Sequence, residues 1–462
     1  MRLWKHIREQ MLQHPYKTIS EDGAQLTYEE VVVFAEYFSS KIKNEACCVI
    51  LCNNEMATAM AVLSCFAAEV TAVPLSLRYG EKHCQKIIDR INPTALISDI
   101  GGQLQVIKLQ NNGYKYPERH PAVIMCTSGT TGVPKGAMLS EENILANTKD
   151  ILAYLELSSE DIILISRPLY HCAVLTGEFI TSLLRGVNIV FYSEAFDPNK
   201  ILTIIRNNNV TVFGGTPTIL NLLAIFNRKE KITSLNTISV SGEQLSRTVA
   251  AKIADAFTNT SIYNVYGLTE ACPRVSYLPP EYFEIKSDSV GKPLNSVTIK
   301  IVTSHGSIAV PYEEGMLWVK GPNVMLGYYD DEGSTKNVLK DGWLCTGDIA
   351  MQDCDGFLYI RGRSDDLIIR GGMNIYPADI ECSVKNDPRT KDVFVYGYEE
   401  RGQVKIGMRI SGAYNSVEEV NKMCAMYLSP FQIPSKIELL DELPKNGSGK
   451  IIRKKVKNER HY

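Results

Sequence analysis

Residues 127–137 form the densest group of phosphate-binding residue types in the chain. They read Thr-Ser-Gly-Thr-Thr-Gly-Val-Pro-Lys-Gly-Ala and follow a short apolar run, Ala122 to Cys126. A backbone with so few Cβ atoms can approach phosphate oxygens closely, and its N–H groups and hydroxyls can bind them while Lys135 adds charge. The segment does not have Walker A spacing. Its composition alone fits either a nucleotide-phosphate loop or a plain surface loop.

A second group of chemically useful side chains lies in Asn-Val-Tyr-Gly-Leu-Thr-Glu, which ends at Glu270. Tyr266 can stack on a base, Thr269 can bind a phosphate, and Glu270 can hold a hydrated Mg²⁺. The same seven residues also fit a strand that runs into a helix, so this segment alone does not decide between the two interpretations.

Three further residues lie next to glycines, in segments whose flexible backbone can hold their side chains toward a ligand. Asp348 follows a tight glycine turn, where an aspartate is a common partner of ribose hydroxyls. Arg363 lies in Gly-Arg-Ser-Asp-Asp, and Lys450 ends Gly-Ser-Gly-Lys close to the C-terminus. Each of them, taken singly, also fits an ordinary loop charge.

Composition places the chain among soluble globular proteins. It has 462 residues, 45% apolar and 22% charged, with a net charge of −3, so nothing draws it to nucleic acid or to an anionic membrane. The most apolar window, 57–68, is too short to span a bilayer, and the N-terminus lacks an apolar signal core. Its 12 cysteines show no Cys-x-x-Cys spacing, which argues against a zinc site or a disulfide framework and predicts a cytoplasmic location.

The first 290 residues alternate between strand-like and helix-like segments. Helices are expected to begin after Thr27, Ser140 and Thr216, because each of these residues is a good N-cap. Strands are expected at 47–52, 70–74, 122–126, 162–166, 187–192 and 210–214. This alternation predicts an α/β architecture with largely parallel sheets.

The pattern changes after about residue 290, where short strands separated by turns dominate. A boundary is expected at 361–366, and the last 100 or so residues carry a pattern of their own, with helices expected after Pro377 and Ser416. We therefore expect a large domain over 1–363 and a small α+β domain over 364–462.

The order of these motifs along the chain resembles that of the adenylate-forming superfamily of acyl-CoA synthetases, peptide-synthetase adenylation domains and luciferases. Weaker matches extend the resemblance over nearly the whole chain, at 26–29, 73–74, 168–171, 241–243 and 290–293. The resemblance implies a large N-terminal domain of mostly parallel sheets flanked by helices, with a small β-barrel-like part. It also implies a small mobile C-terminal domain that rotates about a hinge near Asp365.

The resemblance implies that ATP, with Mg²⁺, activates a small carboxylic acid as an acyl-adenylate with release of pyrophosphate. A thiol, of CoA or of a phosphopantetheinyl carrier protein, then takes the acyl group. Because two anions must meet, positioning and electrostatics carry most of the catalysis.

The resemblance also assigns roles to individual residues. The catalytic group is Lys450, Thr269 and His171, with Asp365 as the hinge, and Glu270 binds the metal. The nucleotide-binding group is Thr127, Ser128, Gly129, Thr130, Thr131, Gly132, Lys135, Ser241, Gly242, Glu243, Tyr266, Gly267, Asp348 and Arg363.

One departure from the family pattern concerns the acid. Amino-acid-activating relatives usually carry an aspartate after the position of His171, where this chain has Cys172. A neutral thiol pairs poorly with an ammonium group, so a free amino acid is disfavoured. The expected acid pocket is small and mostly apolar, and consists of Cys172, Ala173, Val174, Gly177, Ala271 and Cys272.

Alternative functions remain open on the sequence. One is a ligase that loads an aryl or acyl acid only onto an acyl or peptidyl carrier protein, in secondary-metabolite or siderophore biosynthesis. Another is a non-catalytic nucleotide-binding relative, although Lys135, Glu270 and Lys450 are all present. A nucleic-acid ligase is disfavoured, because the net charge offers no basic surface.

Overall fold

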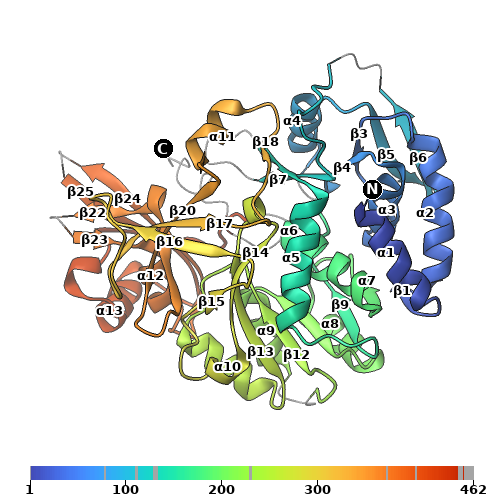
Figure 1. Cartoon of the computed structure of the whole chain (residues 1–462). Helices are drawn as coiled ribbons and strands as arrows, with labels where there is room; N and C mark the ends of the chain where they lie inside the picture. The colour runs from blue at the N-terminus through green and yellow to red at the C-terminus, as the bar shows by residue number, and fades with distance from the viewer. Residues whose placement is uncertain are drawn as a thin grey trace.

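The computed structural model describes residues 2–77, 80–109, 113–127, 134–227, 232–370, 373–400, 403–445 and 451. The fold contains two large sheets, one antiparallel sheet and a small C-terminal unit, and Figure 1 colours the chain from the blue N-terminal end to the red C-terminal end.

The first large sheet has seven strands in the order β18-β8-β7-β4-β3-β5-β6. Strands β3, β4, β5 and β7 run parallel, whereas β6, β8 and β18 are antiparallel to their neighbours. The bounds are β3 Cys47–Ile50, β4 Thr71–Pro74, β5 Ala95–Ile100, β6 Gln103–Lys108, β7 Val123–Thr127, β8 Lys135–Leu139 and β18 Gly327–Tyr328.

The second large sheet has nine strands in the order β15-β14-β13-β12-β11-β9-β10-β1-β2. Its centre, from β13 to β1, is parallel. The bounds are β1 Thr18–Glu21, β2 Ala24–Thr27, β9 Ile162–Ile165, β10 Asn188–Phe191, β11 Val212–Gly215, β12 Thr237–Val240, β13 Ser261–Gly267, β14 Arg274–Leu278 and β15 Lys292–Pro293.

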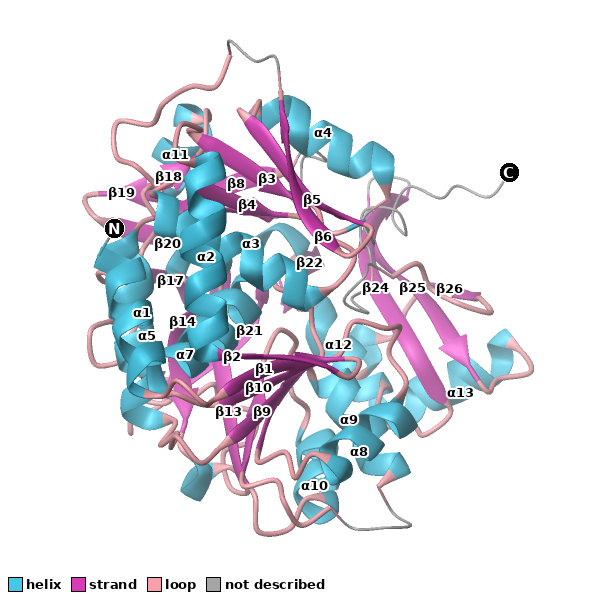
Figure 2. Cartoon of the chain, turned by 90° about the vertical axis from the view of Figure 1, so that its right-hand side faces the viewer, coloured by secondary structure: helices cyan, strands magenta, loops and turns pink. Residues whose placement is uncertain are grey.

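Helices cover both sheets, as expected for an α/β architecture. Figure 2 shows α1, α2 and α3 between the two sheets and α8, α9 and α10 on the outer side of the second. The bounds are α1 Arg2–Gln13, α2 Tyr28–Ile42, α3 Glu55–Ala68, α4 Glu81–Ile91, α5 Glu141–Tyr154, α6 Cys172–Val174, α7 Thr181–Arg185, α8 Pro198–Asn207, α9 Pro217–Phe226 and α10 Arg247–Ala256. Between α6 and α7 the chain forms a π-helix, Leu175–Ile180.

The capping signals predicted the helix starts correctly. Thr27 and Ser140 each form a capping box with the third helical residue, Glu30 and Asn143 respectively. Thr216 accepts a hydrogen bond from the backbone of Ile219, with Pro217 at the first helical position. These side chains satisfy backbone N–H groups that lack a partner within the helix.

An antiparallel sheet stands where the β-barrel-like part is expected. Its strands follow the order β16-β17-β20-β19, with β21 also paired to β20. The bounds are β16 Thr298–Val302, β17 Gly315–Lys320, β19 Leu339–Lys340, β20 Trp343–Gln352 and β21 Leu358–Arg363, with α11 Glu332–Val338 beside them.

The C-terminal part has a hydrophobic core of its own, built from residues such as Ile368, Ile380, Met408 and Met423. It lies at the left of Figure 1, in orange and red. The bounds are β22 Ile368–Arg370, β23 Met373–Ile375, α12 Pro377–Val384, β24 Thr390–Glu400, β25 Gln403–Gly412, α13 Val417–Tyr427 and β26 Lys436–Leu439.

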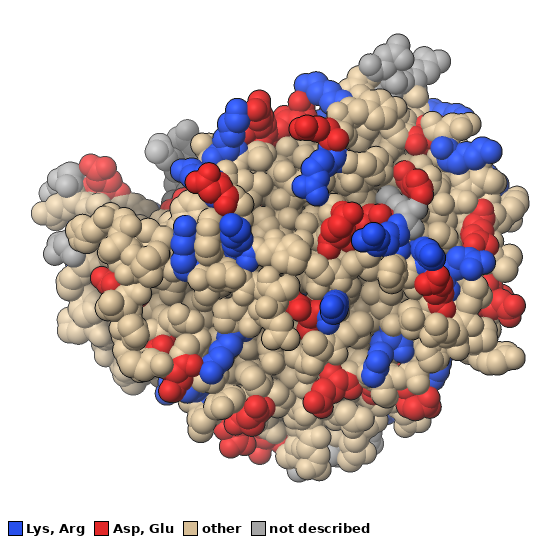
Figure 3. All heavy atoms as spheres, in the orientation of Figure 1, with Lys and Arg blue, Asp and Glu red and all other residues tan. Residues whose placement is uncertain are grey.

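Charges are mixed rather than gathered by sign on the face seen in Figure 3. Acidic and basic side chains lie interspersed across that face. Among the described residues, no helix has both the length and the apolar character that crossing a membrane requires.

Candidate active site

The two ends of the phosphate loop are adjacent strands. Thr127 closes β7 and pairs in register with Lys135, which opens β8. The two ends of the loop therefore lie side by side, at the carboxyl end of β7 and the start of β8. The predictions for Ser128, Gly129, Thr130, Thr131, Gly132 and Lys450, and for the side chain of Thr127, lie outside the described residues.

Lys135 and Glu270, predicted to bind phosphate and metal, meet at a residue that sequence reasoning missed. The Tyr328 hydroxyl donates to Glu270 Oε1 at 2.8 Å, and Lys135 Nζ lies 4.9 Å from the centroid of the same ring. Burial, reinforced by the charge of Glu270, raises the pKa of Tyr328. The phenol thus stays protonated and orients the carboxylate. One carboxylate beside a phosphate loop is a common way to hold Mg²⁺.

Tyr266, Asp348 and Arg363 form one connected group. The Tyr266 hydroxyl donates to Asp348 Oδ2 at 2.5 Å, and Arg363 Nη1 lies 3.4 Å from Asp348 Oδ1. Asp348 on β20 and Arg363 on β21 are register partners. Arg363 Nη1 also donates to the carbonyl of Thr346 at 2.8 Å. Burial, together with the nearby Asp348, raises the pKa of Tyr266 well above its usual range.

Two glycines are required by this packing. A Cβ on Gly267 would lie 1.8 Å from the carbonyl oxygen of Pro273, and one on Gly347 would lie 2.7 Å from Arg363 Nη2. Gly347 also has a φ of +75°, which side-chain-bearing residues rarely adopt. Gly267 therefore lets the turn carrying Thr269 fold tightly against β14.

The turn with Thr269 and Glu270 is held by buried amides. Asn323 Nδ2 donates to the carbonyls of Ala271 and Arg274, at 2.8 and 3.0 Å. Asn147 Nδ2 donates to the same Arg274 carbonyl, and its Oδ1 accepts from the Arg274 N–H. These bonds fix the backbone that presents the candidate phosphate and metal residues.

The segment with Ser241, Gly242 and Glu243 follows β12. Ser241 Oγ accepts from Arg167 Nη1 at 3.1 Å, and Gly242 has a φ of +91°. Glu243 accepts from the Thr218 hydroxyl at 2.6 Å, at the start of α9. Ser241 and Glu243 are thereby tied to the segments that follow β9 and β11.

The expected acid pocket is brought together around two thiols. Cys172 Sγ lies 3.7 Å from Thr176 Oγ1, which in turn lies 3.4 Å from the carbonyl of Cys272. Burial, with Cys172 close by, raises the pKa of Cys272 well above its usual range, so this thiol stays neutral. Val174 and Ala271 are fully buried nearby, and His171 stands at the N-cap of α6.

A buried ion pair beside this pocket was not predicted. Arg167 Nη2 contacts Glu178 Oε1, and both side chains are at least nine-tenths buried. The π-helix turns Glu178 toward the second sheet, where a Cβ on Gly214 would overlap its carboxylate. π-Helices recur at functional sites. The one feature of the sequence that could have indicated this ion pair is the presence of two charged residues, Arg167 and Glu178, at the ends of a largely apolar stretch.

The candidate hinge, Asp365, lies in a 3₁₀ turn, Ser364–Asp366. Its carboxylate is 4.0 Å from Arg363 Nη2. Beyond it, the Tyr376 hydroxyl donates to Glu314 at 2.6 Å, and Arg361 Nε donates to the other oxygen of that carboxylate at 2.9 Å. Glu314 is thus shared between residues on the two sides of the candidate hinge.

Comparison with known families matches most of the chain. The model of the AMP-binding enzyme family matches residues 7–329, and that of the AMP-binding enzyme C-terminal domain matches residues 379–450.

Individual relatives agree with these matches. The chain is 30% identical to 2-succinylbenzoate–CoA ligase of Bacillus subtilis, over 94% of this chain and 95% of that protein. It is 33% identical to feruloyl-CoA synthase of an Amycolatopsis species, over 72% and 69% of the two chains. Its fold matches O-succinylbenzoate coenzyme A synthetase of Bacillus subtilis in complex with AMP, with a TM-score of 0.87 and 27% identity over 98% of each chain. The chain therefore belongs to the family of AMP-binding enzymes.

Proposed function

We propose that the protein is an AMP-forming ligase that joins an acyl or aryl acid to coenzyme A. The observation that carries the proposal is the convergence of two groups on the Thr269 turn. Tyr266 with Asp348 and Arg363 lies on one side of it, and Lys135 with Tyr328 and Glu270 lies on the other. The first group suits a nucleoside and the second suits its phosphates.

In the first step, an oxygen of the acid attacks the α-phosphorus of ATP, pyrophosphate leaves and an acyl-adenylate remains. The barrier arises from charge, because an anion approaches a phosphate that gains negative charge in the transition state. We assign Lys135 to the β/γ-phosphates, Thr269 to the α-phosphate and Lys450 to the meeting point of the acid and the α-phosphate. Mg²⁺, when bound at Glu270, would neutralise phosphate charge.

In the second step, the thiolate of coenzyme A attacks the acyl carbon and AMP leaves. Lys450 belongs to the C-terminal part, so the same rotation that withdraws it would open a path for the thiol. We therefore propose domains over 1–363 and 364–462 with a hinge at Asp365. The separate core of the C-terminal part supports this division, as does the placement of Asp365 in a short turn between the two.

The acid slot favours a substrate acid that carries no charge apart from its reacting carboxylate, and disfavours an amino acid. Its described walls contain thiols and small apolar groups around Cys172, Ala271 and Cys272, so none of these residues offers a carboxylate to an α-ammonium. The related enzymes named as 2-succinylbenzoate–CoA ligase and feruloyl-CoA synthase support an aryl acid as the first choice. We also propose a cytoplasmic location, because all 12 cysteines are free thiols, as is usual in a reducing compartment.

Carboxylate-dependent ATP–pyrophosphate exchange tests the first step. The panel contains aliphatic, aryl and amino acids, and the expected result is exchange with aryl or acyl acids only. Preference for an amino acid would contradict the interpretation of Cys172, and no exchange with any acid would leave a non-catalytic nucleotide-binding protein.

The acceptor is tested with the acid that supports exchange. Thioester formation is compared between free coenzyme A and a phosphopantetheinylated carrier protein. We expect product with free coenzyme A. Product with the carrier protein alone would instead identify a carrier-loading ligase.

A further inference from the structure

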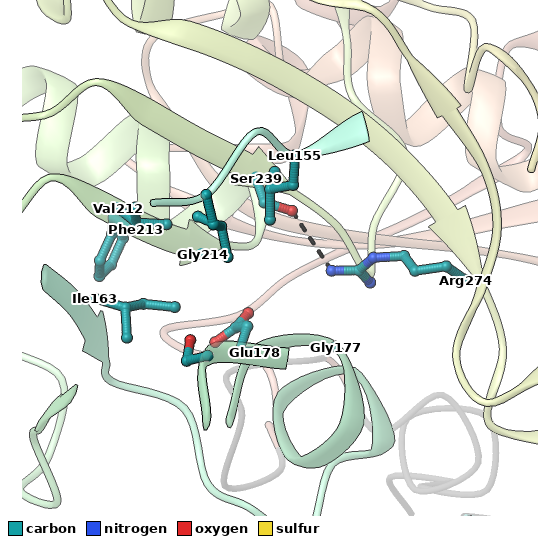
Figure 4. Close-up of a pocket in the computed structure, with 11 residues that line it drawn as sticks. Leu155, Ile163, Gly177, Glu178, Val212, Phe213, Gly214, Ser239 and Arg274 are labelled. Atoms are coloured by element: carbon teal, nitrogen blue, oxygen red, sulfur yellow. Dashed lines mark hydrogen bonds between the residues drawn. The ribbon is translucent and has the colours of Figure 1, made fainter. Parts of the chain in front are cut away.

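A small cavity lies beside the residues of the predicted acid slot. Its volume is about 10 Å³, which is the space that about one water-sized oxygen occupies. The π-helix and α7 form one wall, and β11, β12 and β14 form the other (Figure 4). Apolar side chains such as Leu155, Ile163 and Phe213 close it.

Three of the polar residues that line this cavity each leave one atom without a hydrogen bond. In the part of the chain that the structure describes, Arg274 Nε, Glu178 Oε2 and Ser182 Oγ have no hydrogen-bond partner. Arg274 is 3% exposed, Glu178 5% and Ser182 0%. Figure 4 shows Arg274 and Glu178 reaching toward the same space from β14 and the π-helix. Buried polar atoms are normally satisfied, so three on one cavity indicate a missing partner.

The chemistry of these atoms limits what the partner can be. Arg274 only donates hydrogen bonds, and the Glu178 carboxylate, paired with Arg167, only accepts them. A second carboxylate would be repelled by Glu178, and an ammonium by Arg274. A hydroxyl oxygen both donates and accepts, so it satisfies Glu178 and Arg274 together, and it fits the volume.

The cavity borders the predicted acid slot at Gly177. This residue belongs to the predicted slot and also lines the cavity. A Cβ there would lie 3.5 Å from Arg274 Nη2, so the bare glycine faces the guanidinium directly. At the other end, Cys172 Sγ lies 3.9 Å from the Thr269 carbonyl. Cys172 lies on α6 and Glu178 on the π-helix that follows it, which separates the reacting end of the slot from the cavity.

We propose that this cavity binds a hydroxyl group at the end of the substrate acid opposite its reacting carboxylate. The inference rests on the proposed ligase function and narrows its substrate class to acids with a distal hydroxyl, phenolic or aliphatic. Arg274 and Glu178 are then the residues that determine specificity. An acid without the hydroxyl leaves their buried atoms unpaired, and sites of this kind reject such analogues strongly.

The test compares acids that differ only in this hydroxyl. The pairs are 4-hydroxycinnamate with cinnamate, 3-(4-hydroxyphenyl)propanoate with 3-phenylpropanoate, and 8-hydroxyoctanoate with octanoate. The readout is kcat/KM in pyrophosphate exchange. We expect at least one pair to favour the hydroxylated acid by about 100-fold or more.

Equal use of both members of every pair would overturn the proposal and leave the cavity to a permanent water molecule. That result differs from failure of the proposed function, in which no acid supports exchange.

Two variants test the assignment to the cavity. Arg274→Leu and Ser182→Ala should each reduce the ratio of kcat/KM between the preferred pair, whereas Arg247→Leu, at an exposed arginine paired with Asp288, should keep it. Ser182→Ala removes only one oxygen. If Arg274→Leu does not fold, Ser182→Ala alone tests whether the preference for the hydroxylated acid arises in the cavity. A ratio that survives both changes contradicts the proposal.

Discussion

The Tyr266 hydroxyl donates a 2.5 Å hydrogen bond to Asp348 Oδ2, which joins the residue proposed to stack on adenine to the residue proposed to bind ribose. The two come from different sheets, since Tyr266 lies on β13 and Asp348 on β20. Arg363 approaches the other oxygen of the same carboxylate. The proposed nucleoside subsite is therefore already assembled by protein contacts, which lowers the ordering cost of binding.

Asp348→Ala is expected to raise the KM for ATP by about 10- to 100-fold, because hydrogen bonds to a charged group contribute ~1.5–3 kcal/mol. Tyr266→Phe keeps the ring and should have a smaller effect in the same direction. Both are measured by pyrophosphate exchange at a saturating concentration of the acid. Asp355→Ala, at an exposed turn, is the control. An unchanged KM in Asp348→Ala would remove Asp348 from the nucleotide site.

Lys135→Ala should weaken the use of ATP without changing which acid is preferred. Its ammonium group lies against the Tyr328 ring, and the Tyr328 hydroxyl donates to Glu270, the candidate metal residue. We expect a rise in the KM for ATP of about 10-fold or more, with unchanged kcat/KM ratios between acids. Lys115→Ala, which loses only an exposed pair with Asp330, serves as the matched lysine control. An altered order of acid preference would contradict this division of roles.

Lys450→Ala should abolish adenylation while sparing thioester formation from acyl-adenylate that is supplied directly. In the proposed mechanism Lys450 stabilises the charge that builds up at the α-phosphate during adenylation, and that charge no longer forms once the adenylate exists. The two half-reactions are assayed separately with one acid and coenzyme A. Lys391→Ala, at an exposed lysine of the same C-terminal part, should leave both intact. Equal loss in the two half-reactions would reject the role of Lys450.

Asp365→Pro should impair thiol transfer more than adenylation. Proline fixes φ near −65° and so restricts rotation at the candidate hinge, whereas Asp365→Ala leaves the backbone free. The ratio of the two half-reaction rates is the measurement. If the proline and alanine variants transfer the acyl group at the same rate, the hinge lies elsewhere.

Local signals predicted much of this fold, because they act within a few residues. The N-cap side chains at Thr27, Ser140 and Thr216 determine where helices begin, and each acts over three residues. The motif that contains Tyr266 and Thr269 is likewise recognisable from residues that are adjacent in the sequence. The contact between Tyr328 and Glu270 joins residues 58 positions apart in sequence, and no local pattern encodes it.

The same limit explains why the ion pair of Arg167 and Glu178 was missed. The pair is separated by 11 residues, and its contact depends on the π-helix, whose extra residue per turn changes the face on which Glu178 lies. Periodicity counted at α-helical spacing does not anticipate that rotation. Arg274, in turn, follows the predicted slot residue Cys272 by two positions, but its burial depends on packing against Gly177.

The buried pair of Arg167 and Glu178 also gives a prediction for stability. Glu178→Ala leaves the Arg167 guanidinium buried without its partner, and breaking a buried pair in this way costs about 3–5 kcal/mol. The double change Arg167→Leu with Glu178→Leu removes both charges and should cost less than Glu178→Ala alone. Urea unfolding gives the free energies, and Glu332→Ala, at an exposed pair on α11, should show no measurable change. A double variant that is as unstable as the sum of its single variants would mean that the two side chains contribute independently.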